Sequence, residues 1–506
     1  MIYINGENLA LQQMIDVVRG FEKVALDQEG IEKVKASRKL VEELIERGEV
    51  VYGITTGFGK LADVMIPQEK VEELQRNLIL SHACGVGDPL PKEVVRAMML
   101  LRANALVKGY SGIRLETLQL LVDMLNADVV PVVYSQGSVG ASGDLVPLAH
   151  MVLVMLGYGE AYYQGERMPG DKALIKAGLK PITLGAKEGL ALINGTQCMT
   201  ALGALGVYDS LNLAKTADIC AALTMEALQG IPDAYDERIQ QLRPHPGQLK
   251  AARNIRAILN GSGLVYRKER DRVQDAYTLR CTPQVHGASR DAINYVAEVV
   301  VREINSATDN PLIFPEDGIV FSGGNFHGQP IALAMDFLGI ALAELANISE
   351  RRIERLVNSN LSGLPPFLIA DSGINSGYMI AQYTAASLVS ENKVLSHPAS
   401  VDSIPTSANQ EDHVSMGTIA ARKMYNILTN AENVLAVELL TAAQALEFRD
   451  KDKLASGTKA VYDLIRSSIP ALTHDRLIAP EIHKMQEKIH SGEIIQAVEQ
   501  VVGLLL

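Results

Sequence analysis

The stretch Gln136-Gly137-Ser138-Val139-Gly140-Ala141-Ser142-Gly143-Asp144-Leu145-Val146-Pro147-Leu148-Ala149-His150 decides how this sequence is interpreted. Its centre, residues 141–144, places three very small residues beside one acid. Glycine has no Cβ and tolerates backbone conformations closed to other residues, so the segment suits a chain that folds tightly back on itself. One interpretation is an ordinary glycine-rich turn before a helix, with Ser142 or Asp144 as the N-cap.

Two functional motifs that this stretch resembles in part are excluded by their spacing. A phosphate-binding loop needs a lysine after its second glycine, and no lysine follows here. A hydrolase nucleophile elbow has the pattern Gly-x-Ser-x-Gly. Gly140 and Ser142 fit that pattern, but position 144 is an aspartate. Neither phosphate binding nor serine hydrolysis is therefore expected at this loop.

The composition indicates a mainly helical globular protein. Of the 506 residues, 47% are hydrophobic and 21% are charged, which is typical of a chain that buries a large core. Aromatic residues make up only 5%, there is no tryptophan, and alanine and leucine abound, which favours helix over sheet. The net charge of -12 disfavours nucleic acid as a partner.

Long helices are expected in the second part of the chain. Residues 331–358 and 415–448 run through many turns with almost no Gly or Pro, and their N-terminal halves are nearly apolar all round. Such helices are buried in a bundle or in an oligomer interface. A shift in composition predicts two domains, 1–195 and 196–506. The expected fold is mainly α, a long-helix bundle with a smaller mixed α/β N-terminal part that carries the Ala-Ser-Gly loop.

Shorter elements are expected in the N-terminal part. The spacing of apolar residues predicts helices over 71–82, from 91 to about 109, and over 115–125. A short strand is predicted over 128–134, and a hairpin over 158–169 with its turn at Gln164-Gly165.

Metal, disulfide, secretion and membrane signals are absent from the sequence. The four cysteines, at positions 84, 198, 220 and 281, form no Cys-x-x-Cys pair, and there is no His-Glu-x-x-His motif. The N-terminus lacks the basic and apolar regions of a signal peptide. The longest apolar run, residues 145–156, is too short to span a bilayer. These features predict a cytoplasmic protein with reduced thiols, no metal and no membrane partner.

The Ala141-Ser142-Gly143 stretch resembles the signature of the aromatic amino acid ammonia-lyases. In that family the tripeptide cyclises on itself, which here implies that the nitrogen of Gly143 attacks the carbonyl of Ala141 and that Ser142 loses water to become a dehydroalanine. The product is methylidene-imidazolone (MIO), an electrophile made from the chain without an external cofactor. Gly143 allows the compression, Ser142 supplies the leaving hydroxyl, and a larger residue at 141 would crowd the ring.

Further stretches match the same family in the same order along the chain. They are Tyr52-Gly53-Ile54-Thr55-Thr56-Gly57-Phe58-Gly59, Leu74-Gln75-Arg76-Asn77-Leu78 with Ser81-His82, Asn194-Gly195-Thr196, Gln274-Asp275-Ala276-Tyr277-Thr278-Leu279-Arg280-Cys281, and Gly324-Asn325-Phe326-His327-Gly328. Each stretch alone has an ordinary structural explanation, such as a turn or a core residue. Their joint occurrence favours the resemblance over those separate explanations.

The resemblance implies roles for individual residues. Tyr52 would be the base, with its phenolate stabilised by nearby donors. Arg280 would hold the substrate carboxylate. Asn194, Tyr277 and Gln274 would donate hydrogen bonds to the substrate or to the MIO oxygen. The implied catalytic residues are Tyr52, Ala141, Ser142, Gly143, Asn194, Tyr277, Phe326 and Glu411, and the implied substrate-binding residues are His82, Gln274, Arg280 and Glu411.

The substrate is inferred from Ser403-Ile404-Pro405-Thr406-Ser407-Ala408-Asn409-Gln410-Glu411-Asp412-His413-Val414-Ser415-Met416, which resembles the histidine branch of the family. The Glu411 carboxylate suits an imidazole N–H and would be costly to bury against a phenyl ring. This implies conversion of L-histidine to trans-urocanate and ammonia, with either the substrate amine or its ring adding to the electrophile. The alternatives are a tyrosine or phenylalanine ammonia-lyase or aminomutase with the same MIO group, and a non-catalytic helical scaffold. Family members are homotetramers with shared active sites, so the same assembly is expected here.

Overall fold

A computed structural model of the chain describes residues 1–57, 66–265 and 273–506. The chain divides into two compact units. Unit 1 consists of Met1–Leu205, Ala297–Asp336 and Pro398–Arg422, and unit 2 consists of Gly206–Val296, Phe337–His397 and Lys423–Leu506. Each unit is assembled from three separate stretches of sequence, whereas the predicted boundary after residue 195 is a single cut. That boundary stays a prediction about domain organisation.

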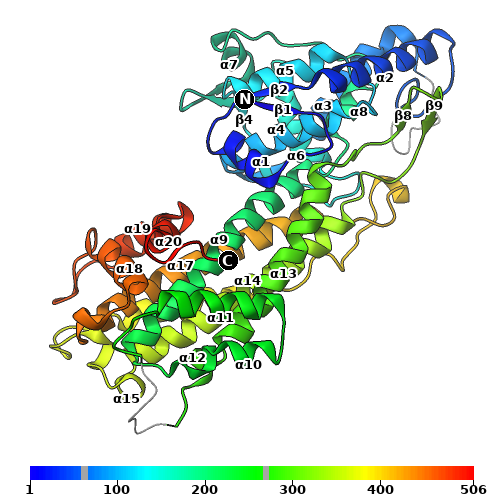
Figure 1. Cartoon of the computed structure of the whole chain (residues 1–506). Helices are drawn as coiled ribbons and strands as arrows, with labels where there is room; N and C mark the ends of the chain where they lie inside the picture. Colours follow the sequence, from blue (N-terminus) through cyan, green and yellow to red (C-terminus); the bar gives the residue numbers. More distant parts are fainter. Residues whose placement is uncertain (58–65, 266–272) are drawn as a thin grey trace. The chain divides into compact units, whose positions relative to one another are not determined.

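Unit 1 is the mixed part of the molecule, where short strands lie among helices (Figure 1). Its strands are β1 Ile2–Ile4, β2 Val24–Leu26, β3 Val86–Pro89, β4 Val130–Pro131, β5 Tyr134–Gln136, β6 Glu160–Tyr163, β7 Glu166–Pro169, β8 Leu312–Phe314 and β9 Ile319–Phe321. Its helices are α1 Leu11–Val18, α2 Gln28–Glu46, α3 Val71–His82, α4 Lys92–Val107, α5 Leu115–Asn126, α6 Leu145–Met155, α7 Gly170–Lys176 and α8 Glu188–Ile193, with short 3-10 turns at Gln68–Lys70 and Ser407–Asn409.

The strands of unit 1 form small separate sheets. β1 pairs with β2 in parallel, β3 with β5 and β8 with β9 antiparallel, and β4, β6 and β7 form a three-stranded sheet. The predicted hairpin is present as β6 and β7, with left-handed backbone at Gln164 and Gly165 in its turn. β3 and β5 lie next to each other in space, and β5 ends just before the Ala-Ser-Gly loop.

Four long helices have residues in both units: α9 Gln197–Ala227, α13 Thr282–Ile304, α14 Gln329–Val357 and α17 Gly417–Leu446. The other elements of unit 2 are α10 Glu237–Gln241, α11 Pro246–Ile258, α12 Tyr277–Arg280, α15 Ser359–Ser362, α16 Met379–Leu395, α18 Ser456–Arg466, α19 Ala479–His490 and α20 Glu493–Val502, with 3-10 turns at Pro232–Tyr235, Pro366–Leu368 and Lys451–Lys453. The predicted mainly helical fold, with a mixed N-terminal part, is confirmed.

A buried ion pair joins the long helices within unit 2. The Glu438 carboxylate of α17 accepts hydrogen bonds from Thr224 of α9, at 2.8 Å, and from Ser349 of α14, at 2.6 Å. It also pairs with Arg352 of α14 through Nε and Nη2, at 2.6 and 2.8 Å. A charged pair inside a helix bundle is tolerated only when its remaining hydrogen-bonding groups are satisfied. Here the hydrogen bonds to Glu438 fix the register of α9, α14 and α17.

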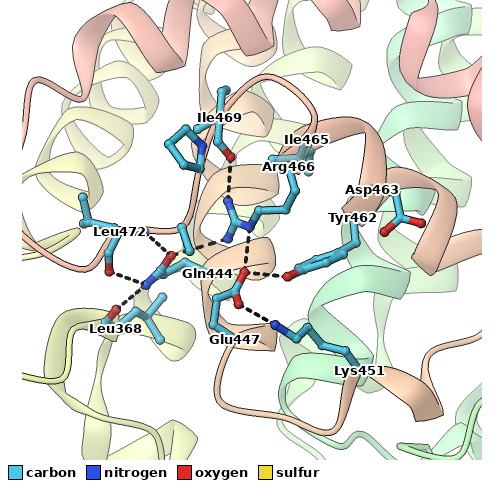
Figure 2. A network of polar contacts seen from close by, with 12 residues as sticks. Leu368, Gln444, Glu447, Lys451, Tyr462, Asp463, Ile465, Arg466, Ile469 and Leu472 are labelled. Atoms are coloured by element: carbon cyan, nitrogen blue, oxygen red, sulfur yellow. Dashed lines mark hydrogen bonds and ion pairs between the residues drawn. The ribbon is translucent and has the colours of Figure 1, made fainter.

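Figure 2 shows a second polar network, at the C-terminal end of α17. Glu447 accepts hydrogen bonds from Tyr462 and Arg466 of α18, at 2.6 and 2.7 Å. Gln444 donates to the carbonyls of Leu368 and Leu472, at 3.0 and 2.9 Å. The two Gln444 bonds satisfy buried backbone carbonyls of the 3-10 turn at Pro366–Leu368 and of the segment that follows α18.

One helix in the described part of the chain, α14, is long and apolar enough to cross a membrane by length and composition alone. Its most apolar window has a mean hydropathy of 1.8, and 67% of that window is buried inside the protein. Core helices of globular proteins pass the same test, because a helix that is apolar all round is also what a bundle interior requires.

Candidate functional site

The loop between β5 and α6 is pressed against the turn that precedes α9. Gly143 forms a parallel bridge with Gly195, and the backbone N–H of Asp144 donates to the Gly195 carbonyl at 2.6 Å. Gly143 has a φ of +72°, and a Cβ at this position would lie 2.1 Å from the Gly195 oxygen. Only glycine fits here, because both the backbone conformation and the available space exclude a side chain.

The other side of the loop is held by residues 415–416, which precede α17. The Met416 N–H donates to the Val139 carbonyl at 2.9 Å, and the Ser415 hydroxyl donates to the Gly140 carbonyl at 3.2 Å. Ala141 is buried among Val414 and Met416, so a larger side chain would have to displace that cluster. The tripeptide is thus fixed by two segments that are distant from it in sequence.

Asp144 stands at the start of α6, but its carboxylate caps a different helix. Oδ2 accepts hydrogen bonds from the backbone N–H groups of Cys198 and Met199, at 2.8 and 2.9 Å, in the first turn of α9. Oδ1 accepts from the Thr418 hydroxyl at 2.5 Å. Burial raises the pKa of Asp144 to about 6, although all three hydrogen bonds act in the opposite direction. The residue therefore joins the tripeptide loop to both α9 and α17.

Glu411 interacts with both Ser142 and His82 in unit 1. The half-buried Ser142 hydroxyl donates to Oε1 of Glu411 at 3.5 Å. Burial lowers the pKa of His82, while a hydrogen bond to the Leu78 backbone and the negative charge of Glu411 act against that shift. The His82 imidazole is therefore close enough to Glu411 to interact with its charge.

Asn194 lies beside the tripeptide, in the turn between α8 and α9. Its Nδ2 donates to Oδ1 of Asp309 at 3.1 Å and to the carbonyl of Asn310 at 3.0 Å. Both side-chain N–H bonds are therefore used within the protein, which leaves neither for the predicted donation from Asn194 to the substrate or to the MIO oxygen. The buried Arg102 guanidinium donates to the Asn194 carbonyl at 3.1 Å and fixes the turn from the other side.

The remaining predicted residues of unit 1 are Tyr52 and Phe326. Tyr52 is half-buried in a turn over residues 52–55, which follows α2. Phe326 is half-buried in the loop between β9 and α14. The end of the predicted Tyr52–Gly59 stretch, Phe58-Gly59, lies outside the described residues.

Gln274, Tyr277 and Arg280 belong to unit 2, where Tyr277 and Arg280 bound the short helix α12. The Arg280 guanidinium lies over the Tyr277 ring, 4.4 Å from its centroid, and its Nε donates to the Asp275 carbonyl at 3.0 Å. Tyr277 is 70% exposed, and Gln274 is also exposed. The guanidinium is therefore preorganised by cation–π contact and a hydrogen bond, with further donors left for a ligand.

Comparison with known proteins identifies the family. Residues 9–467 match the profile of the family described as aromatic amino acid lyase. The chain belongs to the aromatic amino acid lyase family. It is 59% identical over 506 residues to the histidine ammonia-lyase of Natranaerobius thermophilus, with 100% of both chains covered.

Two solved structures of this family are similar along nearly the whole chain. The histidine ammonia-lyase of Trypanosoma cruzi has 44% identity and a TM-score of 0.92, over 98% of this chain and 95% of the other. The tyrosine aminomutase of Streptomyces globisporus has 38% identity and a TM-score of 0.94, over 99% and 98%. Lyases and aminomutases of this family thus share one architecture, and the substrate has to be inferred from side chains.

The tripeptide fits the cyclised group predicted from the sequence. Gly143 has the left-handed backbone and the absence of a Cβ that a close approach requires. Ser142 has a carboxylate within hydrogen-bonding reach of its hydroxyl. The clamps at Gly195 and Ser415 supply the surrounding structure that a strained backbone needs.

Two residues of this site were missed by the sequence analysis. The sequence indicates Asp144 only as a possible cap for the helix that follows it, and its bonds to α9 involve residues more than fifty positions away. The sequence indicates no role for Thr406, and its hydroxyl donates to Oε2 of Glu411 at 2.6 Å. For Asp144, the available signal is a carboxylate between a glycine-rich stretch and an apolar one. Thr406 stands in a polar stretch and gives no such signal.

Proposed function

We propose that this member of the aromatic amino acid lyase family is a carbon–nitrogen lyase that releases ammonia from L-histidine and forms trans-urocanate, the first step of histidine breakdown. The observation that carries the proposal is the Glu411 carboxylate beside Ser142. A carboxylate at this distance from the tripeptide is a suitable acceptor for an imidazole N–H and an unfavourable neighbour for a phenyl ring. The histidine ammonia-lyases at 59% and 44% identity support the same substrate.

The electrophile would be MIO, formed from Ala141, Ser142 and Gly143. The Gly143 nitrogen bonds to the Ala141 carbonyl carbon, and two water molecules leave. One carries the Ala141 oxygen with the amide hydrogens of Ser142 and Gly143, and the other carries the Ser142 hydroxyl with its Cα hydrogen. Once formed, the group supplies an electrophilic methylene that assists departure of the amine.

The other side chains would bind the substrate and move one proton. Arg280 pairs with the substrate carboxylate, and Glu411 and His82 bind its imidazole ring. Tyr52 takes the hydrogen from the substrate Cβ as a proton. The Cβ–H and Cα–N bonds break, the electron pair of the former makes the Cα–Cβ double bond, and ammonia leaves.

We also propose that the working enzyme is a homotetramer with shared active sites. Apolar side chains of unit 2 that a single chain leaves exposed support this assembly, among them Tyr295 of α13 at 56%, Phe337 of α14 at 44% and Tyr383 of α16 at 61%. A chain that exposes several large apolar side chains on its long helices has surface to bury against other copies.

The experiment that tests the proposal is the Ser142→Ala variant. Wild-type protein is expected to weigh less than its encoded sequence by two water molecules, and to convert L-histidine to urocanate. The variant is expected to keep its encoded mass, to remain folded by circular dichroism, and to lose turnover. Ser491→Ala, at an exposed position in unit 2, serves as the control and keeps both properties. Turnover near the wild-type rate in Ser142→Ala would overturn the assignment of the electrophile.

A further inference from the structure

Glu411 lies at one end of a short arm whose backbone is closed by hydrogen bonds. Thr406 and Glu411 form an antiparallel bridge, in which the Thr406 N–H donates to the Glu411 carbonyl at 3.0 Å and the Glu411 N–H donates to the Thr406 carbonyl at 3.3 Å. Nearer the tripeptide, the Val414 N–H donates to the Ser403 hydroxyl at 3.0 Å. The backbone of Glu411 is therefore fixed on both sides.

The turn that closes this arm has an uncommon backbone. Ser407, Ala408 and Asn409 have φ values of 51°, 53° and 65°, so three consecutive residues with side chains lie in the left-handed region. Each such residue costs free energy and persists only where the surrounding structure holds it in place. The turn itself is exposed, whereas Thr406 and Glu411 at its two ends are half-buried. The bonds between those two residues close the turn.

The side chain of Glu411 is held as well as its backbone. The Thr406 hydroxyl donates to Oε2 at 2.6 Å, while Oε1 lies 3.5 Å from the Ser142 hydroxyl. A free glutamate side chain rotates about three bonds, and a hydrogen bond to a carboxylate is among the stronger ones in proteins. With Oε2 engaged by Thr406, Oε1 is the oxygen left to face the tripeptide.

We propose that Thr406 is a positioning residue that directs Oε1 of Glu411 toward the imidazole of the substrate. This inference rests on the proposed function, because it concerns the binding of histidine. Thr406 does not touch the substrate. It acts by removing the rotational freedom of the side chain that does, and so it contributes to the selectivity for a ring that carries an N–H group.

The test compares Thr406→Val with Thr406→Ser in the full-length enzyme. Valine keeps the shape and removes the hydroxyl, whereas serine keeps the hydroxyl. We expect Thr406→Val to raise KM for L-histidine about tenfold with kcat changed much less, because a hydrogen bond to a charged group is lost from binding. Thr406→Ser is expected to keep KM within about twofold of the wild-type value, since it retains that bond.

Mass and thermal melting of each variant separate positioning from folding. Both variants are expected to show the loss of two water molecules that marks the cyclised tripeptide. If the wild-type enzyme converts histidine but Thr406→Val and Thr406→Ser have the same KM, the role of Thr406 is overturned and the proposed function is not. The role is also overturned if Thr406→Val lowers the melting temperature and kcat but leaves KM unchanged. A wild-type enzyme without activity on histidine would overturn the proposed function, and this inference with it.

Discussion

The loop over residues 138–144 and the segment over residues 275–280 are held in different ways. The loop is bonded through its backbone to Gly195 and to residues 415–416, and its central glycine has no room for a Cβ. In the segment, Tyr277 is 70% exposed, and the Arg280 guanidinium lies over the Tyr277 ring. Rearrangement of a backbone requires compression by distant parts of the chain, whereas recognition of a carboxylate requires a guanidinium that remains accessible.

The largest expected effect is that of Gly143→Ala, which inserts a Cβ 2.1 Å from the Gly195 oxygen. We expect the two water molecules to be retained and kcat/KM for histidine to fall by about a thousandfold or more, since each ~1.4 kcal/mol of barrier is a factor of ten. Mass spectrometry and steady-state kinetics measure both effects. Gly165→Ala is the matched control, because Gly165 has a φ of +83° with nothing within 4 Å of the added Cβ. It is expected to cost about 1 kcal/mol of stability and no activity.

A second prediction concerns the charge buried at the base of the loop. Burial raises the pKa of Asp144 from its ordinary value of 3.8 to about 6. The folded protein therefore binds this proton more tightly than the unfolded chain, and the free energy of unfolding should fall as pH rises from about 4 to about 6, then level off. An asparagine at this position can still accept hydrogen bonds from the backbone N–H groups of α9 through its side-chain oxygen, and its amide group can donate to the Thr418 hydroxyl.

Asp144→Asn is expected to remove this part of the pH dependence. The wild type loses stability between pH 4 and pH 7, and the variant does not lose this part. The unfolding free energy of the variant minus that of the wild type should therefore be up to about 3 kcal/mol larger at pH 7 than at pH 4, since one pKa unit is worth about 1.4 kcal/mol. Urea unfolding at both pH values measures that difference. A difference that stays constant with pH would contradict the account of the buried charge.

The smallest effect of the series is expected in the exposed segment. Arg280→Lys keeps the positive charge but loses the planar guanidinium that binds a carboxylate through two parallel hydrogen bonds. We expect kcat/KM for histidine to fall about tenfold to a hundredfold, mainly through KM, with the tripeptide still cyclised. Arg253→Lys, at an exposed position on α11, is the control and should change neither quantity. Unaltered kinetics in Arg280→Lys would remove it from carboxylate binding.

Local elements were predictable from the sequence because they depend on near neighbours. The predicted helix over 71–82 coincides with α3, and the predicted long helices over 331–358 and 415–448 correspond to α14 and α17 within about two residues at each end. The predicted strand over 128–134 was only partly right. The stretch is divided into β4 and β5, which pair with different strands. A continuous apolar run does not indicate which strands lie beside it, so the sequence could not predict this division.

Contacts between distant segments were not predictable in this way. The sequence placed Ser142 and Glu411 in one site only through the family resemblance, since 269 positions separate them. The capping of α9 by Asp144 and the bond from Thr406 to Glu411 depend on how backbone segments meet in space. The periodicity of apolar residues carries no information on contacts between distant segments. For the same reason the sequence predicts a single boundary at residue 195, whereas each unit of the structure is built of three stretches.

The most direct test of the central claim is ultraviolet absorbance over time with L-histidine, and separately with L-tyrosine and L-phenylalanine. Growth of a urocanate band with histidine alone is the result that the Glu411 carboxylate beside Ser142 predicts. A coumarate or cinnamate band from the other substrates, with no urocanate from histidine, would contradict the substrate assignment. Folded protein with a fully cyclised tripeptide and no product from any of the three would contradict the proposed lyase activity itself.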